Sequence, residues 1–108
     1  MSDVIELTRR LGREPNVDTA LHIMQWNLGD LTKCYTHSKW HPELSGPYLT
    51  EAKLALGSLL FQAEVVASLL GTDTATLFDL GRDTVLDRIE DYEKKVGRFQ
   101  YYKGDKDA

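Results

Sequence analysis

Residues 54–70 form the most apolar run of the chain, seventeen residues with Glu64 as the one charge. Apolar side chains recur there at nearly every position, so a helix over this run would be apolar almost all round. A helix of that kind is covered on several sides, in a bundle core, in a subunit interface or in both. We therefore expect residues 48–70 to form the central helix of the fold and to pair with a second copy of the chain.

Prolines and glycines divide the rest of the chain into helical blocks. The prolines are Pro15, Pro42 and Pro47, and no alternating strand pattern of useful length occurs. Gly12 and Gly71 follow the first and third blocks and are natural helix ends. The periodicity of the apolar residues predicts four helices, over residues 3–11, 19–39, 48–70 and 74–96. Because short connections join these amphipathic segments, the predicted fold is all-α, an antiparallel bundle of about four helices that dimerises through the third.

The length of 108 residues fits one domain with one hydrophobic core. We expect a single all-α domain over 1–108, with its core in about 18–96. Past Gly97 the apolar periodicity is lost, and residues 98–108 are predicted to be a flexible tail.

The charge balance and the single cysteine limit the classes of partner and the cellular compartment that we expect. Thirteen basic and seventeen acidic residues leave a net charge of -4 without a concentrated basic run, so we expect no nucleic acid as partner. The run 54–70 is shorter than the ~20 residues of a membrane-spanning helix. The one cysteine, Cys34, fits a reducing compartment, and the acidic start is unlike a signal peptide. These features predict a cytoplasmic, soluble protein that forms a homo-oligomer, a dimer or a tetramer.

Three segments share an order with a known family. Residues 26–31 read Trp-Asn-Leu-Gly-Asp-Leu, residues 54–60 read Leu-Ala-Leu-Gly-Ser-Leu-Leu, and residues 69–73 read Leu-Leu-Gly-Thr-Asp. Over roughly residues 18–95 the chain resembles the MazG-like all-α nucleotide pyrophosphohydrolases. That family carries an acid-rich segment on one helix, a second on the next, and a Leu-Gly corner after an apolar run.

The resemblance implies a metal site with most of its acids substituted. The family holds Mg²⁺ with an acid-x-x-acid pair on each of two facing helices, and these positions are Asn27, Asp30, Ala55 and Ser58 here. Asp30 is therefore the expected ligand, with Asn27 and Glu51 as helpers, because Glu51 shares the face of the two substituted positions. The implied activity is weak or lost hydrolysis of a nucleotide, and the resemblance assigns no catalytic or substrate-binding residue.

Other features leave alternatives open. The chain could be a non-enzymatic helical interaction or assembly protein that acts through self-association of its apolar helix. Cys34, His37 and His41 have metal-like spacing, although they supply only three ligands, and a buried thiol with two surface imidazoles explains them as well.

Two further expectations concern the helix interiors. Glycine within a helix costs roughly 1 kcal/mol relative to alanine, so Gly29 and Gly57 are predicted to lie at close helix contacts. The isolated charge of Glu64 predicts an ion-pair partner in a second copy of the chain.

Overall fold

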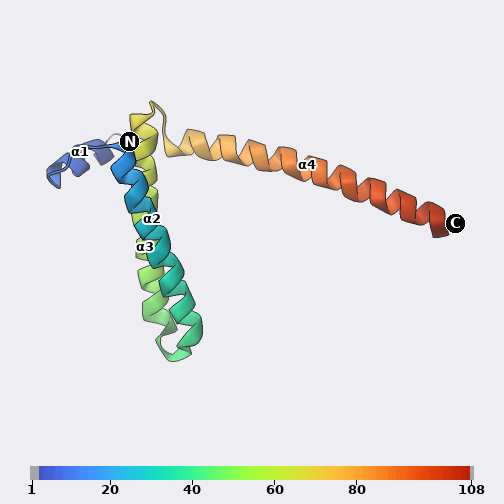
Figure 1. Ribbon diagram of the computed structural model, residues 1–108, viewed down its shortest axis with the longest axis horizontal. Coiled ribbons are helices and arrows are strands. Elements are labelled where there is room, and N and C mark those ends of the chain that lie inside the picture. The colour runs from blue at the N-terminus through green and yellow to red at the C-terminus, as the bar shows by residue number, and fades with distance from the viewer. Residues whose placement is uncertain (1–2, 108) are drawn as a thin grey trace. The chain divides into compact units, whose positions relative to one another are not determined.

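The computed structural model describes the backbone of residues 3–107 and the side chains of residues 3–98. In chain order its elements are α1 (Asp3–Arg10), α2 (Val17–Trp40), the 3₁₀ helix η1 (Pro42–Leu44), α3 (Ser45–Leu69) and α4 (Thr74–Asp107) (Figure 1). The described residues contain no strand. The prediction of an all-helical chain with four α-helices is confirmed.

The chain divides into two compact units, and the boundary lies between Thr74 and Ala75. The first unit contains α1, α2, η1 and α3, and the second is the helix α4. The prediction that residues 1–108 form one domain stays a prediction, because the structure defines each unit by itself.

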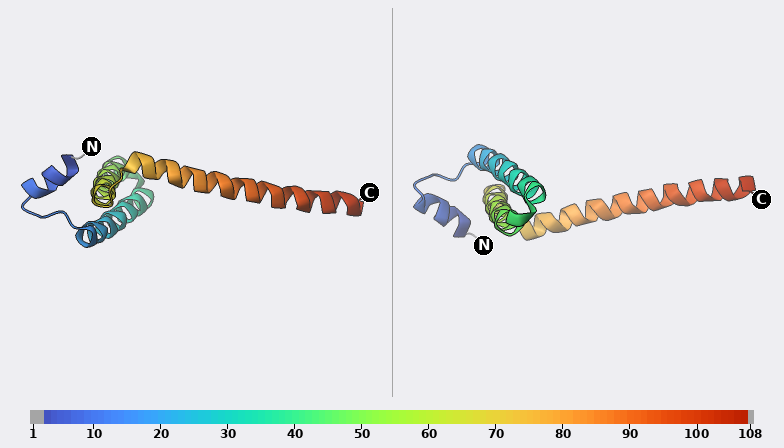
Figure 2. Two further views of the ribbon diagram at one scale, coloured as in Figure 1. Left: turned by 90° about the horizontal axis from the view of Figure 1, so that it is seen from above. Right: turned by 90° about the horizontal axis from the view of Figure 1, so that it is seen from below.

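In the first unit, α2 and α3 run antiparallel and lie side by side in every view (Figures 1 and 2). The Asn16 side chain caps the start of α2 by accepting a hydrogen bond of 3.1 Å from the Thr19 amide. Pro42 then begins η1, which reverses the chain. Pro47 lies within the first turn of α3 rather than before it, because a helix needs no amide donor there. The third helix therefore begins earlier than the predicted residue 48.

Two glycines end helices in the same way. Gly12 follows α1 with φ of 83°, and Gly71 follows α3 with φ of 79°, both in the left-handed region. At the end of α3, the Gly71 amide donates to the Ser68 carbonyl and the Thr72 amide donates to the Ala67 carbonyl. This pair of bonds is the Schellman motif, which satisfies the last carbonyls of a helix and favours glycine for its positive φ.

The core of the first unit is small. Val4 of α1, Ala20 of α2 and Val65 of α3 form the buried cluster, and Val65 is the largest fully buried side chain. Leu21, Leu28 and Tyr35, which share one face of α2 at a spacing of seven residues, lie outside this core, since they are 43%, 54% and 51% exposed. The small residues Ala20 and Ser38 are the buried ones of α2 instead. The two helices therefore pack closely but leave most large apolar side chains uncovered.

The second unit is one long helix. α4 continues through Gly81 and Gly97 as far as Asp107, so the sequence-based end at residue 96 is wrong. Its backbone includes residues 98–107 of the expected tail, whereas Ala108 lies outside the described residues. Whether residues 98–108 are mobile stays a prediction.

One helical stretch of the described chain, Pro42–Leu69, is long and apolar enough to cross a membrane by length and composition alone. It exceeds the seventeen-residue apolar run because η1 and the first turns of α3 extend it, so length does not exclude a membrane. Only 17% of its most apolar window is buried in the chain. This helix therefore needs a cover that the first unit does not supply.

Candidate functional site

An open hollow beside α2 and α3 is lined by two of the predicted site residues. Its polar lining comes from Asn27 of α2 and from Lys53, Ser58 and Gln62 of α3. Ile23, Leu54 and Phe61 are among its apolar walls. The antiparallel packing of the two helices brings these residues together, because positions three or four apart lie on one face of each helix.

The structure brings together two of the four family positions. Asn27 and Ser58 line the hollow, whereas Asp30, Ala55 and Glu51 are not among its lining residues. The Asn27 Nδ2 atom is buried and has no hydrogen-bond acceptor among the described residues. An unpaired buried amide donor of this kind is uncommon in proteins and makes Asn27 the position to test by substitution.

Lys53 and Gln62 are the polar neighbours that the sequence reading missed. Lys53 lies five residues before Ser58 and Gln62 four after it, and both line the same hollow. Only the one-turn spacing of Gln62 gave a signal in the sequence. The contribution of Lys53 depends on how α2 and α3 pack.

The donor set fits a magnesium site poorly. Asp30 is the one carboxylate at the family positions, and both Asp30 and Glu51 are exposed. Between residues 3 and 98, no three His, Cys, Asp or Glu side chains gather as a group that could hold a metal ion. Mg²⁺ favours octahedral oxygen ligation with one or two carboxylates and substrate phosphates. No metal-dependent hydrolytic step follows from this donor set, and the ligand roles of Asp30, Asn27 and Glu51 stay a prediction.

The mid-helix glycines do not mark close contacts within the described chain. A Cβ atom added at Gly29 or Gly57 would meet no side chain or neighbouring backbone within 4 Å. The predicted close approach of helices at these two positions is therefore wrong for the chain by itself. Gly57 instead lines the hollow beside Ser58.

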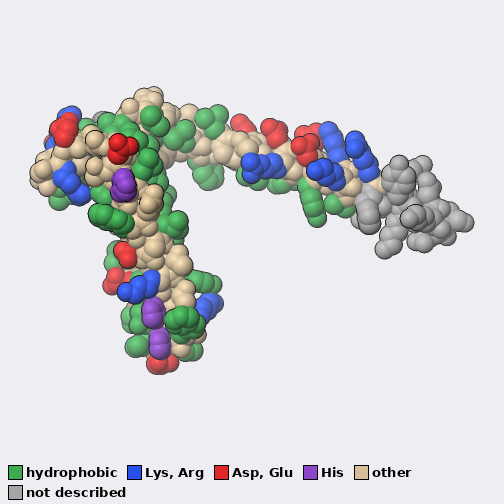
Figure 3. All heavy atoms as spheres, viewed as in Figure 1, with side chains coloured by type: hydrophobic (Ala, Val, Ile, Leu, Met, Phe, Trp, Pro, Cys, Tyr) green, Lys and Arg blue, Asp and Glu red, His purple; other side chains and the backbone are tan. Residues whose placement is uncertain are grey.

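The histidines near the end of α2 form an aromatic stack. The His37 ring lies 5.7 Å from His41 with an interplanar angle of 10°, and 5.2 Å from Tyr48 of α3. The lone pair of an imidazole lies in the plane of its ring, so parallel stacked rings do not aim their nitrogens at one point. Cys34 is a free, half-buried thiol. The arrangement joins α2 to α3 by aromatic packing. Figure 3 shows histidine side chains near the closed end of the hairpin.

Glu64 has a partner within its own chain. Its carboxylate accepts a hydrogen bond of 3.1 Å from the Thr74 amide and one of 3.2 Å from the Thr74 hydroxyl. Thr74 is the first residue of α4, where unpaired amides and the helix dipole favour a negative charge. The predicted ion pair across a subunit interface is therefore not needed to explain this charge.

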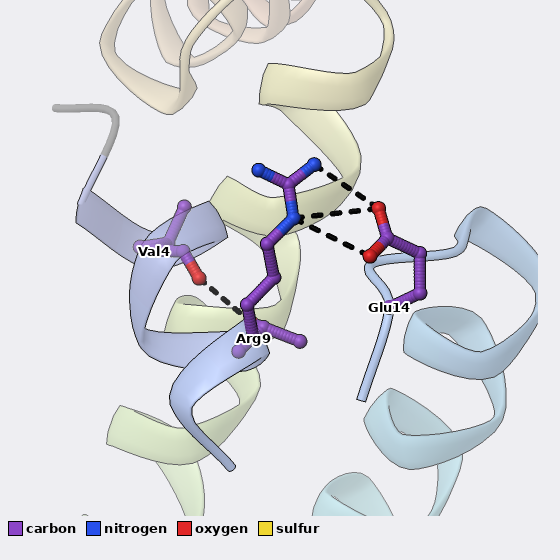
Figure 4. Close-up of polar contacts among 4 residues, drawn as sticks. Val4, Arg9 and Glu14 are labelled. Carbon is purple, nitrogen blue, oxygen red and sulfur yellow. Dashed lines mark hydrogen bonds and ion pairs between the residues drawn. The ribbon is translucent and has the colours of Figure 1, made fainter. Parts of the chain in front are cut away.

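The connection between α1 and α2 carries an exposed ion pair. The Arg9 guanidinium donates to Glu14, with Nη2 3.0 Å from the nearer carboxylate oxygen (Figure 4). The hydrogen bond and the charge of Glu14 raise the pKa of Arg9 above its ordinary value. Arginine is protonated at physiological pH in any case, so this shift provides no pH switch.

No protein-family model matches the chain, and neither does any curated protein or solved structure.

Proposed function

We propose that the protein is a helical assembly module that associates with further copies of itself through the exposed apolar face of α3. The observation that carries this proposal is that the chain itself buries only a small part of the apolar surface of α3. Leu49, Leu56 and Leu60 are spaced seven and four residues apart, which places them on one face of the helix, and Lys53 lies between Leu49 and Leu56 on the same face. The exposed fractions of the three leucines are 39%, 44% and 57%.

This apolar face borders the contact with α2. The less exposed side of α3 carries Tyr48, Ala52, Ala55 and Leu59. The three leucines lie one residue further along, which is about 100° around the helix from that side. A second hairpin packed there would extend the two-helix layer into a four-helix bundle. Such a bundle would remove the three leucines from water. Each Å² of apolar surface that it buries would stabilise the assembly by about 25 cal/mol.

Charge spacing in α3 favours association in water over insertion in a membrane. Lys53 and Glu64 interrupt the apolar run, and the uncharged interval 54–63 between them spans about 15 Å of helix. A bilayer core is about 30 Å thick, and a charge within it is costly. A soluble, cytoplasmic assembly therefore accounts for α3 better than a membrane span.

The test removes two leucines from the face and compares a leucine on the opposite side. We expect Leu56→Ser/Leu60→Ser to lower the average mass of the full-length assembly in sedimentation equilibrium. Leu54→Ser is the matched control, since Leu54 is 62% exposed and lies about 160° around the helix from Leu56. An unchanged mass in the double variant, or a wild-type chain that binds neutral lipid vesicles and stays monomeric without them, would contradict the proposal.

A second candidate function is weak binding of a nucleotide, as the MazG-like resemblance implies. The observation in its favour is the hollow that joins Asn27 and Ser58 and leaves the Asn27 Nδ2 atom without an acceptor. The Lys53 ammonium on its rim would attract phosphate. Mg²⁺ belongs to this proposal as the companion of the nucleotide phosphates, with Asp30 as the one carboxylate at the family positions.

Asn27→Leu tests this candidate in two ways. Removal of an unpaired buried donor is expected to stabilise the free chain by about 1 kcal/mol and to abolish any thermal shift caused by nucleoside triphosphate with Mg²⁺. Asp30→Ala, run beside it, is expected to reduce the shift only in the presence of the metal. A nucleotide-dependent shift that survives in Asn27→Leu would rule out the hollow as the site.

A further inference from the structure

The helix α4 carries a seam with the spacing of a coiled coil. Within the described side chains, seven positions alternate three and four residues apart: Ala75, Phe78, Arg82, Val85, Ile89, Tyr92 and Val96. We call these seven positions the α4 seam. Six of them are apolar or aromatic, and a spacing of three and four over about three heptads is the pattern that two supercoiled helices share.

The α4 seam has nothing to pack against within its unit, because that unit is a single helix. Phe78, Val85, Ile89 and Tyr92 are 71%, 51%, 44% and 68% exposed. Isolated helices are marginal in water, and most helical stability in proteins comes from packing of an apolar face. The stripe therefore needs a partner helix.

Charges on the two flanks of the α4 seam indicate the partner and its direction. One flank of the α4 seam consists of the positions just before Arg82, Ile89 and Val96, which are Gly81, Arg88 and Lys95. The other flank consists of the positions just after Phe78, Val85 and Tyr92, which are Asp79, Leu86 and Glu93. One flank is thus basic and the other acidic. Figure 3 shows acidic and basic side chains along α4 among hydrophobic ones.

We infer that α4 pairs with α4 of a second copy as a parallel, in-register coiled coil. In a parallel pair the basic flank of each helix faces the acidic flank of its partner, so Arg88 of each copy lies beside Glu93 of the other. In an antiparallel pair, like flanks would meet and repel. Arg88 and Glu93 are five residues apart and about 140° around their own helix, so they are not neighbours within one copy.

A surface hollow on α4 fits this pairing. Phe78, Gly81, Arg82 and Val85 line it together with Leu86. The first four have the spacing of the hole that receives one side chain of the facing helix. In a parallel in-register pair that side chain is Arg82 of the other copy. This register places the two Arg82 side chains opposite each other, so their like charges weaken the pair unless both guanidinium groups reach water at the edges, where Gly81 leaves room for the long stems.

The opposite side of α4 is suited to solvent. It carries Asp83, Asp87, Glu90, Asp91, Lys94 and Arg98. Glu90 and Lys94 form an i,i+4 ion pair of 3.3 Å. Leu77 and Leu80 are apolar exceptions near the start of the helix. This inference rests on α4 alone and stands or falls separately from the proposed association through α3.

Site-specific disulfide formation tests direction and register. In the full chain with Cys34→Ser, Val85→Cys and Tyr92→Cys should each cross-link to the same residue of a second copy, because a disulfide requires Cα atoms about 4.4–6.8 Å apart. Asp87→Cys, on the opposite side of the helix, is the matched control and should not cross-link. Failure of either seam variant to cross-link, as in an antiparallel pair or in packing of α4 on another copy's hairpin, would overturn the inference.

A charge exchange tests the flanks. The dimer dissociation constant is measured in the Leu56→Ser/Leu60→Ser background, which removes the proposed contribution of α3. Arg88→Glu should weaken the dimer about tenfold because two attractive pairs become repulsive, and Arg88→Glu/Glu93→Arg should restore it. Tighter association of Arg88→Glu would indicate an antiparallel pair, and no change would remove the role of the flanks; either result overturns the inference.

Discussion

The α2–α3 hairpin and α4 both carry apolar side chains at helical spacing, but they differ in how these side chains are covered. In the hairpin, part of the apolar surface meets a helix of the same chain, and Val65 is 1% exposed. In α4 the corresponding Val85 is 51% exposed. The comparison shows that helical periodicity predicts a helix and the face that needs a cover, but not which helix supplies the cover.

The largest expected effect comes from a valine-to-alanine change, which is made once in the hairpin and once in α4. Val65→Ala removes two methyl groups from the core and should lower the free energy of unfolding of the hairpin by about 2 kcal/mol. Val85→Ala should leave hairpin unfolding unchanged. Both tryptophans, Trp26 and Trp40, lie in α2, so tryptophan fluorescence in urea reports on the hairpin alone. Equal losses in the two variants would mean that α4 is part of the same cooperative core.

Glycine substitutions sharpen the comparison between helix ends and helix interiors. Gly71→Ala forces a side chain into the left-handed region and should destabilise the hairpin by about 1–2 kcal/mol. Gly29→Ala places a methyl group where no described side chain lies within 4 Å, and should stabilise the hairpin by up to about 1 kcal/mol. A loss on Gly29→Ala would reveal a close contact made only in the assembly.

Gly97→Ala is the α4 counterpart of this change. It should raise the helical signal in circular dichroism without changing the fluorescence midpoint, because Gly97 lies in α4. A shift of the fluorescence midpoint would show that the hairpin senses the stability of α4.

Loss of the α2 cap should have a smaller effect than loss of the core valine. Asn16→Ala removes the acceptor for the Thr19 amide and should destabilise the hairpin by about 1 kcal/mol. Asn16→Asp, which keeps a side-chain acceptor, is the control and should retain wild-type stability. If both variants lose the same amount, the cap hydrogen bond does not contribute.

The smallest effect is expected at the exposed ion pair. Glu14→Gln removes the negative charge next to Arg9, whose side chain is 60% exposed. Exposed ion pairs are screened by water and salt, so the urea midpoint should not change measurably. A clear decrease would show that the α1–α2 connection stabilises the hairpin more than its exposure suggests.

The candidate site was only partly predictable, for a geometric reason. The family resemblance points to Asn27, Asp30, Ala55 and Ser58, and the shared helix face adds Glu51. The structure places Asn27 and Ser58 on one hollow, whereas Asp30 and Glu51 do not line it. Spacing along one helix fixes which residues share a face, whereas the rotation of one helix against another decides which faces meet.

The four helices and several of their ends follow from the sequence, because the relevant interactions are local. Apolar periodicity marked four helices, and Gly12 and Gly71 marked two C-termini through their freedom at positive φ. The partner of Glu64 and the exposure of the Leu21–Leu28–Tyr35 stripe were decided only by tertiary structure. They depend on how helices distant in sequence meet in space, and the spacing of residues along one helix does not encode that choice.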